Sequence, residues 1–313
     1  FNKYGADILR LWAASADYHA DVRCSDAIFK QLSQNYLKFR NTARYCLGNL
    51  DGFDPNNLVA PADMLELDRW AVTRLNALIE KCAQAYNDYE FLVVTHAVND
   101  FCVVDLSNFY LDVLKDRLYC EPAGSVTRRA AQTAMYRILN ALTRMLAPIL
   151  AFTAEEIWSF MPHACDDDTG SVMFNEMPAE TAGGDAAFME RWKQLHAIRD
   201  DLQKAREAPR TAKVVGSSLE AEVELYGTGD LLSFLQQTEA LLPSLFIVSK
   251  VTVREGDGSA CRGDVEGLSV TVAHAKGEKC TRCWSFSDTV GKDAQHSALC
   301  SRCAGVMETL GNA

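Results

Sequence analysis

Four of the eleven cysteines lie in two matched pairs near the end of the sequence. Two residues separate Cys280 from Cys283, two separate Cys300 from Cys303, and sixteen lie between the pairs. Two cysteines at this spacing on a tight turn direct both sulfur atoms at one point, and two such turns supply the four thiolates of a tetrahedral Zn²⁺ site. The spacing therefore predicts one zinc ion held by these four side chains.

A shell of four sulfur atoms leaves the metal no open position for water or substrate, so we expect the zinc to stabilise the fold and to take no part in catalysis. Two disulfides or four separate thiols are the alternatives. Disulfide frameworks belong to short secreted chains, and this sequence has neither that size nor a signal peptide. A further alternative is that His296, four residues before Cys300, replaces one thiolate.

Composition narrows the class of protein. At 313 residues the chain is longer than a typical single domain, and its 48% hydrophobic and 23% charged residues are typical of globular proteins. No run of eighteen apolar residues occurs, which argues against a membrane span. The opening FNKYGADILRLW looks like an internal segment, so we expect a fragment. The remaining cysteines lie mostly in apolar stretches, which favours reduced thiols and a cytoplasmic protein.

Apolar residues recur at helical spacing over the first half of the sequence, and the short connections predict an antiparallel bundle. The expected helices cover residues 25–50, 63–86, 89–110, 127–149 and 153–160. Ser25, Thr127 and Thr153 are the expected N-caps of the first and the last two of these helices.

Beyond residue 162 the hydrophobic pattern changes. One more helix is expected over 187–207, ending before Pro209, and the period then becomes alternating. The expected strands are 219–225, 246–254 and 268–274, with a short helix over 229–241. The predicted fold class is mainly α, with an antiparallel helical bundle, a small α+β unit and a C-terminal zinc-ribbon or knuckle module. The expected divisions are a leading segment (1–24), the bundle (25–162), a loop and junction helix (163–215), the α+β unit (216–275) and the zinc module (276–313).

The sequence contains no GxxxxGK[ST], HExxH or GxSxG pattern, so no catalytic residue is predicted. A net charge of −11 argues against nucleic-acid binding through overall charge, but phosphate contacts require only a local basic face. Lys38, Arg40 and Arg44 lie on or beside the polar side of the first long helix. Because Arg40 and Arg44 are one turn apart and repel, we expect either an RNA phosphate backbone or acidic side chains of a neighbouring helix over them.

The segment from Lys276 to Cys303 contains five Lys or Arg residues and three Asp or Glu residues. A zinc ion bound by four thiolates adds two negative charges, so the balance is zero and any nucleic-acid contact depends on placement. Arg282 and Trp284 are the candidates, because they follow the first cysteine and an indole can stack on a base. The alternative is that Trp284 covers the zinc sulfur atoms.

Several motifs follow one another in a familiar order. They are KYGADILRLWAAS (3–15), RNTARYCLGNLDGFDP (40–55), DRW (68–70), DLSNFYLDVLKDRLYC (105–120), APILAFTAEEIW (147–158), GSSLEAEVELY (216–226) and KCTRCW (279–284). In this succession the sequence resembles the bacterial-type isoleucyl-tRNA synthetases, over nearly its whole length. Valyl-tRNA synthetases share the bundle type but usually end in a charged coiled coil, which this sequence lacks.

The resemblance implies an enzyme that uses ATP and Mg²⁺ to activate isoleucine and then charges tRNA(Ile). The HIGH and KMSKS signatures of its catalytic domain do not occur here, and the editing domain is absent too. The resemblance therefore implies the tRNA-reading part: residues 1–24 joining the catalytic core, an anticodon-binding bundle, and a zinc domain whose ligands are Cys280, Cys283, Cys300 and Cys303. The expected partner is the anticodon region of tRNA(Ile), and the expected protein is a monomer that does not bind membranes.

Two other interpretations remain open. One is a standalone RNA-binding protein with a zinc knuckle. The other is a structural zinc protein that contacts other proteins through its helices.

Overall fold

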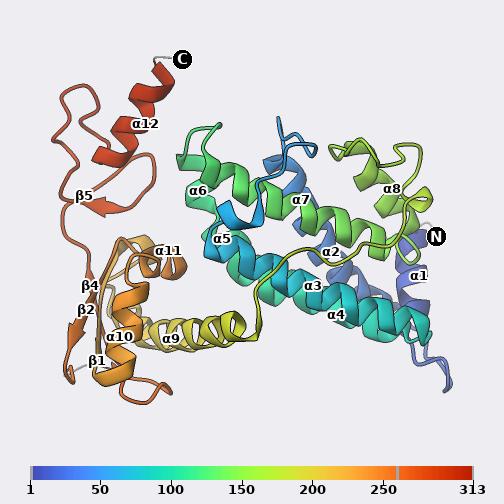
Figure 1. The fold of residues 1–313 in the computed structure, drawn as a ribbon. Helices are drawn as coiled ribbons and strands as arrows, with labels where there is room; N and C mark the ends of the chain where they lie inside the picture. The colour runs from blue at the N-terminus through green and yellow to red at the C-terminus, as the bar shows by residue number, and fades with distance from the viewer. Residues whose placement is uncertain (1–2, 259–260, 312–313) are drawn as a thin grey trace. The chain divides into compact units, whose positions relative to one another are not determined.

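The structure is a computed structural model, and it describes residues 3–258 and 261–311. The first two residues of the expected leading segment and the last two of the expected zinc module lie outside this range. The chain divides into two compact units, Phe1–Leu118 with Ala123–Gly184, and Tyr119–Pro122 with Asp185–Ala313. The predicted fold class is confirmed: the chain is mainly helical, with a small sheet and a C-terminal group of four cysteines (Figure 1).

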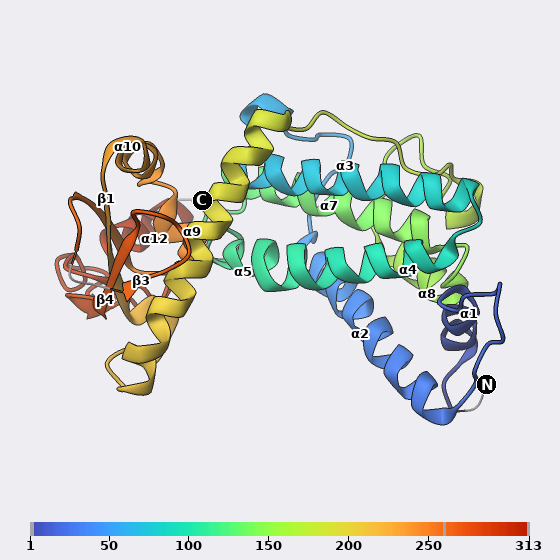
Figure 2. The ribbon, with the colours of Figure 1, turned by 90° about the horizontal axis from the view of Figure 1, so that it is seen from below.

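The first unit is built from helices. They are α1 (Ala6–Ala14), α2 (Asp26–Asn49), α3 (Glu66–Asn87), α4 (Phe91–Asp100), α5 (Leu111–Val113), α6 (Lys115–Cys120), α7 (Val126–Leu146) and α8 (Ala151–Phe160). A π-helical stretch, Phe101–Tyr110, joins α4 to α5, and 3₁₀ turns cover Pro61–Asp63 and Val172–Phe174. Helices α3, α4 and α7 run side by side as the body of the bundle, and α2 packs across it (Figure 2).

Helix α7 forms the centre of this unit. Helices α2, α3 and α8 all pack against it. Its buried residues lie around most of its circumference, and Met135, Ile138, Leu139 and Leu142 have no exposed surface. A helix that is apolar on so many sides is stable only in the interior, so burial of α7 organises the other helices around it.

A buried ion pair ties the start of α3 to α6. Arg117 donates from Nη2 to Oδ1 of Asp68 at 2.6 Å and from Nη1 to Oδ2 at 2.8 Å. The Tyr110 hydroxyl donates to the same Oδ1 at 2.9 Å, and burial holds the pKa of Tyr110 well above its usual value. Because Asp68 is fully buried, it depends on these donors to compensate for the loss of water.

The predicted local caps are partly correct. Ser25 caps α2, because its hydroxyl accepts a hydrogen bond from the Ile28 N–H at 3.3 Å. The prediction of Thr127 as a cap is wrong: Ser125 caps α7, accepting from the N–H of Arg128 at 3.1 Å. Both positions carry a hydroxyl, and the backbone conformation at Ser125 selects between them.

The prediction of Thr153 as the cap of the next helix is also wrong. Helix α8 begins earlier, at Ala151. Its free N–H groups are satisfied by Asp7 of α1, whose carboxylate accepts from the backbone N–H of Thr153 at 2.8 Å and from its hydroxyl at 2.6 Å. A carboxylate 146 residues away in the sequence therefore takes over the role of a local cap.

The second unit contains a four-stranded sheet of order β2-β1-β4-β3. Its elements are α9 (Ala186–Thr211), β1 (Ala221–Gly227), α10 (Gly229–Thr238), α11 (Leu242–Phe246), β2 (Lys250–Glu255), β3 (Cys261–Arg262), β4 (Ser269–His274), β5 (Glu278–Lys279), β6 (Phe286–Ser287) and α12 (Ser301–Gly311). Strand β1 runs parallel to β2 and antiparallel to β4. The predicted alternation is confirmed, with Ala221, Val223 and Leu225 fully buried.

Two predictions for this unit are wrong. Helix α9 continues through Pro209 to Thr211, because the proline removes a single backbone hydrogen bond from a helix of 26 residues. The strand predicted over 246–254 starts only at Lys250. Phe246 is the last residue of α11, and Ile247, which follows it, adopts the left-handed conformation with φ of 55°.

Across the described residues, no helix combines the length and the apolar character needed to cross a membrane.

Replacing Asp68 by Asn should lower the free energy of unfolding of the first unit by about 3 kcal/mol, because Arg117 then stays buried without a counter-charge. Urea unfolding followed by circular dichroism measures this loss. The matched control is Asp112→Asn, whose exposed pair with Lys115 should contribute nothing measurable. Equal stability of the two variants would contradict the structural role assigned to Asp68.

Candidate metal centre and candidate nucleic-acid interface

The first cysteine pair lies in the turn between β5 and β6, which pair in an antiparallel hairpin. The turn is closed by the N–H of Trp284 donating to the carbonyl of Cys280 and by the N–H of Cys280 donating to the carbonyl of Ser285, both at 2.9 Å. Gly277 enters the hairpin at φ of 86°, and a Cβ there would lie 2.4 Å from the backbone carbon of Ser287. This close approach requires glycine.

The second cysteine pair lies at the start of α12. Cys300 directly precedes the helix and Cys303 lies in its first turn. The backbone N–H of Cys300 donates to Sγ of Cys280 at 3.3 Å, which joins the two pairs. A helix start thus presents one pair of sulfur atoms to the hairpin turn that carries the other.

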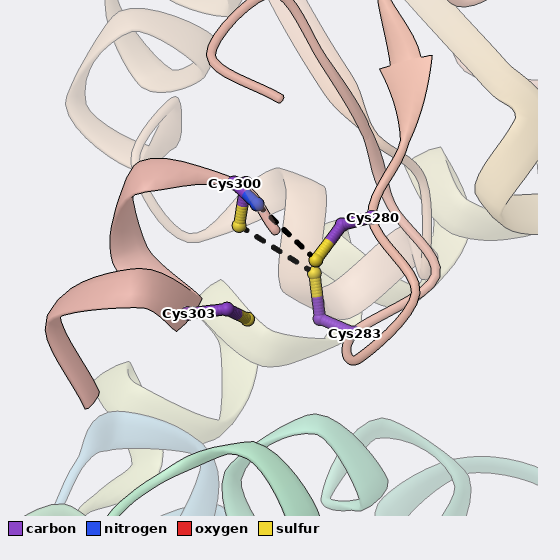
Figure 3. A group of neighbouring side chains, drawn as sticks. All are labelled: Cys280, Cys283, Cys300 and Cys303. Atoms are coloured by element: carbon purple, nitrogen blue, oxygen red, sulfur yellow. Dashed lines mark hydrogen bonds between the residues drawn. The ribbon is translucent and has the colours of Figure 1, made fainter. Parts of the chain in front are cut away.

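All four sulfur atoms lie within 4.8 Å of one another, and Sγ of Cys283 lies 3.8 Å from Sγ of Cys300 (Figure 3). A tetrahedron with Zn–S bonds of about 2.3 Å has edges of about 3.8 Å, so the group has the size that zinc requires. The four cysteines are buried free thiols, far from the roughly 2.05 Å separation of a disulfide. Among the described residues, His296 is not part of this group.

The local backbone favours the thiolate form of Cys280. Burial on its own would raise the pKa of this thiol, but hydrogen bonds from the backbone N–H groups of Cys283, Cys300 and Arg282 outweigh burial and lower the pKa to about 6. Metal ligands must be deprotonated, so these N–H groups prepare the sulfur atom for a cation.

The two candidate RNA contacts beside the zinc site differ in exposure. Arg282 is half-buried, and its Nη1 lies 3.8 Å from Sγ of Cys303, so its guanidinium faces the sulfur group. Trp284 is 62% exposed and has φ of 65°, which is unusual for a residue with a side chain. Exposure of this extent argues against a lid over the sulfur atoms.

Lys279 lies beside Trp284, and no pattern in the sequence points to this pairing. Its Nζ lies 5.8 Å from the centroid of the Trp284 ring, within the range of a cation–π interaction. The two residues are five apart in the sequence, but a hairpin turn brings them together. The pair presents a positive charge and an aromatic face in one place, a combination that suits single-stranded nucleic acid.

The candidates Lys38, Arg40 and Arg44 lie in the first unit, on α2. All three are exposed, and none makes a side-chain hydrogen bond or ion pair with the part of the chain that the structure describes. The acidic partners considered as an alternative are therefore not observed there. At about 100° per residue, Lys38 projects from roughly the opposite side of α2 to Arg40 and Arg44, so the three do not form one patch.

Comparison with known proteins agrees with these features. Residues 68–225 match the family model described as the anticodon-binding domain of tRNA ligase, and residues 277–305 match the zinc finger found in FPG and IleRS. The chain therefore belongs to the family of tRNA-ligase anticodon-binding domains, and it carries a zinc finger of the second family. The family match and the four-cysteine group together support one structural zinc ion.

Curated relatives give a more specific similarity. The isoleucine–tRNA ligase of Syntrophotalea carbinolica is 49% identical over 308 residues, which cover 97% of this chain and 33% of the relative. The enzymes of the same name from Desulforamulus reducens and Geobacter sulfurreducens are 47% and 46% identical, each over 98% of this chain and 33% of their own length. The chain thus spans about a third of these relatives. The resemblance identified from the motifs is confirmed.

Replacing Cys280 by Ser should release the zinc ion and unfold the zinc module, 276–313, while the helical unit stays folded. The zinc content measured by metal analysis should fall from one ion per chain to near zero. A thermal melt should show an additional transition at lower temperature, from the zinc module. Cys261→Ser, at an exposed cysteine outside the group, is the control and should change neither. Unfolding of the zinc module and the helical unit in a single early transition would show that the zinc module is not independent.

Proposed function

We propose that this chain is the tRNA-recognising part of an isoleucine–tRNA ligase and binds the anticodon region of tRNA(Ile). The observation that carries the proposal is the similarity to isoleucine–tRNA ligases over 97% of the chain, together with the anticodon-binding family match over 68–225. In this role the chain supplies binding energy and selects the tRNA. The catalytic domain, with its ATP and Mg²⁺, belongs to another part of the enzyme.

The proposed zinc ligands are Cys280, Cys283, Cys300 and Cys303. The distances among their sulfur atoms support this assignment. A closed four-sulfur shell gives the ion a structural role: it fixes the turn that carries Trp284. We assign no catalytic residue in this chain.

The proposed RNA contacts are Trp284 and Arg282 on the zinc module and Lys38, Arg40 and Arg44 on α2. Anticodon bases are unpaired, so an exposed indole on a rigid turn can stack on one of them. Exposed basic side chains without acidic partners suit phosphates. The guanidinium of the half-buried Arg282 lies against a sulfur atom of the zinc site. Arg282 is therefore the less accessible of the two proposed contacts on the zinc module.

We further propose that the enzyme acts as a monomer in the cytoplasm. None of the eleven cysteines, all of which the structure describes, forms a disulfide, and this agrees with a reducing compartment.

Replacing Trp284 by Ala should weaken binding of tRNA(Ile) about five- to a hundredfold through loss of stacking, whereas Trp284→Phe should keep most of the affinity. Filter binding to tRNA(Ile) and to an anticodon-substituted tRNA measures both.

Arg40→Ala with Arg44→Ala should reduce affinity for both tRNAs and flatten the salt dependence. Binding that is insensitive to both anticodon and salt would refute RNA recognition by this chain.

The chain on its own should show no isoleucine-dependent exchange of pyrophosphate into ATP, because its 313 residues lack the HIGH and KMSKS signatures. A full-length isoleucine–tRNA ligase assayed in parallel is the positive control. Exchange above background by the purified chain would contradict the proposed division of labour.

A further inference from the structure

The four-cysteine group is buried, and its charge requires compensation. Zn²⁺ bound by four thiolates carries two negative charges. Cys280 and Cys303 have no exposed surface, and Cys283 and Cys300 are almost as deeply buried. A charge removed from water is unfavourable unless hydrogen bonds or an opposite charge replace the water. The residues around the site therefore have to supply N–H donors and positive charge.

Backbone N–H groups meet the first of these needs. The N–H of Cys300 donates to Sγ of Cys280, and the N–H of Cys303 donates to Sγ of Cys300. These neutral donors stabilise the sulfur atoms but leave the net charge of the group in place. The positive charge has to come from a side chain.

Arg282 brings a positive charge to this group. Its Nη1 donates to Sγ of Cys303 at 3.8 Å. A guanidinium stays protonated at any physiological pH, and hydrogen bonds between charged partners are stronger than those between neutral ones. Because Arg282 is half-buried, water and salt screen its charge less than that of an exposed side chain.

The end of α6 holds this guanidinium from the other side. Nη1 of Arg282, which carries two hydrogen atoms, also donates to the backbone carbonyl of Cys120, the last residue of α6. The thiol of Cys120 donates in turn to the backbone carbonyl of Arg282 at 3.8 Å. The last carbonyls of a helix have no partner within the helix, so Arg282 satisfies one of them.

Cys120 lies in the same compact unit as the zinc module. It belongs with Tyr119–Pro122 to the second unit, and its buried side chain packs against the four cysteines. It is not a member of the group whose sulfur atoms lie within 4.8 Å of one another. Cys120 therefore acts on Arg282 through its carbonyl and not as a fifth metal ligand.

We propose that Arg282 is a positioning residue of the zinc site: the carbonyl of Cys120 holds its guanidinium against the thiolate of Cys303, and this raises the affinity of the four cysteines for zinc. Loss of such a partner behind the ligands typically costs about ten- to a hundredfold in metal affinity. The inference rests on the proposed zinc ligands and needs no RNA. It assigns part of the site to a helix end 162 residues before Arg282, outside the matched zinc-finger segment 277–305.

Replacing Arg282 by Ala in the whole chain should weaken zinc binding about ten- to a hundredfold. Competition with a coloured zinc chelator, without RNA, measures the dissociation constant. Arg282→Lys keeps the charge without the planar fork and should lose less affinity than Arg282→Ala. The matched control is Lys292→Ala, which removes a positive charge from an exposed position of the same module and should leave the affinity unchanged. Equal affinity in Arg282→Ala and Lys292→Ala would overturn the proposal, and an equal loss in Arg282→Lys and Arg282→Ala would contradict the role of charge.

A spectroscopic measurement separates this role from a general loosening of the module. With excess Co²⁺ as the probe, Arg282→Ala should still hold the ion among four sulfur atoms. Its sulfur-to-metal charge-transfer absorption should move to longer wavelength, because a thiolate that has lost an N–H donor gives up electrons more readily. Lys292→Ala should show the spectrum of the unchanged chain. A charge-transfer band at the same wavelength in Arg282→Ala would count against the proposed contact with Cys303, whatever the zinc affinity.

Metal analysis of the same preparations separates this inference from the proposed ligands. If the chain holds one zinc ion, loses it in Cys280→Ser and binds it equally tightly in Arg282→Ala, the role of Arg282 alone is refuted. If the unchanged chain holds no zinc, the ligand assignment fails and the inference fails with it.

Discussion

Four thiols within 4.8 Å of one another cannot all ionise without a cation between them. The rest of the zinc module depends on this constraint, because little else holds it together. Among its described residues, the buried ones are the four cysteines and Ala304, and its strands β5 and β6 are two residues each. A module with so small a core needs a metal to fold, and the metal in turn fixes the hairpin turn on which Trp284 stands.

The first unit achieves rigidity by a different route. Its stability comes from the burial of α7 among its neighbours, and a buried pair between Asp68 and Arg117 specifies how α3 and α6 meet. Exposed basic residues such as Arg40 and Arg44 contribute nothing to this core, and their mutual repulsion slightly opposes helix formation. Stability and the proposed RNA contacts thus involve different side chains of the same unit.

In the second unit, Trp284 likewise contributes little to the core and is exposed to solvent. Its indole lies in solvent, and a residue with a side chain seldom adopts its positive φ. The surrounding hydrogen bonds, between Cys280 and Ser285 and between Cys280 and Trp284, impose this conformation. An exposed aromatic ring that the backbone holds in place loses little entropy on binding, which favours stacking on an unpaired base.

Local patterns in the sequence determined the elements and the candidate metal ligands. Each of these patterns depends on residues a few positions apart: the paired spacing of the cysteines, the helical stripes, the alternation in β1 and the cap at Ser25. The structure confirms the helical stripes, the alternation and the cap. It supports the predicted zinc ion. Local signals failed where a distant group acts on an element: Asp7 caps α8 from 146 residues away, and no local rule points to it.

Only the tertiary structure decided which side chains share a surface. Lys38 and Arg40 are two residues apart in the sequence, yet the helix turns them to opposite sides, and a pocket beside α2 combines side chains of α1, α2 and α4. Such groupings arise from packing between helices, and packing depends on the shapes of whole side-chain surfaces. The sequence by itself therefore determined the elements and the zinc-binding pattern, whereas the combination of charge, cavity and exposed ring became visible only once the helices were packed.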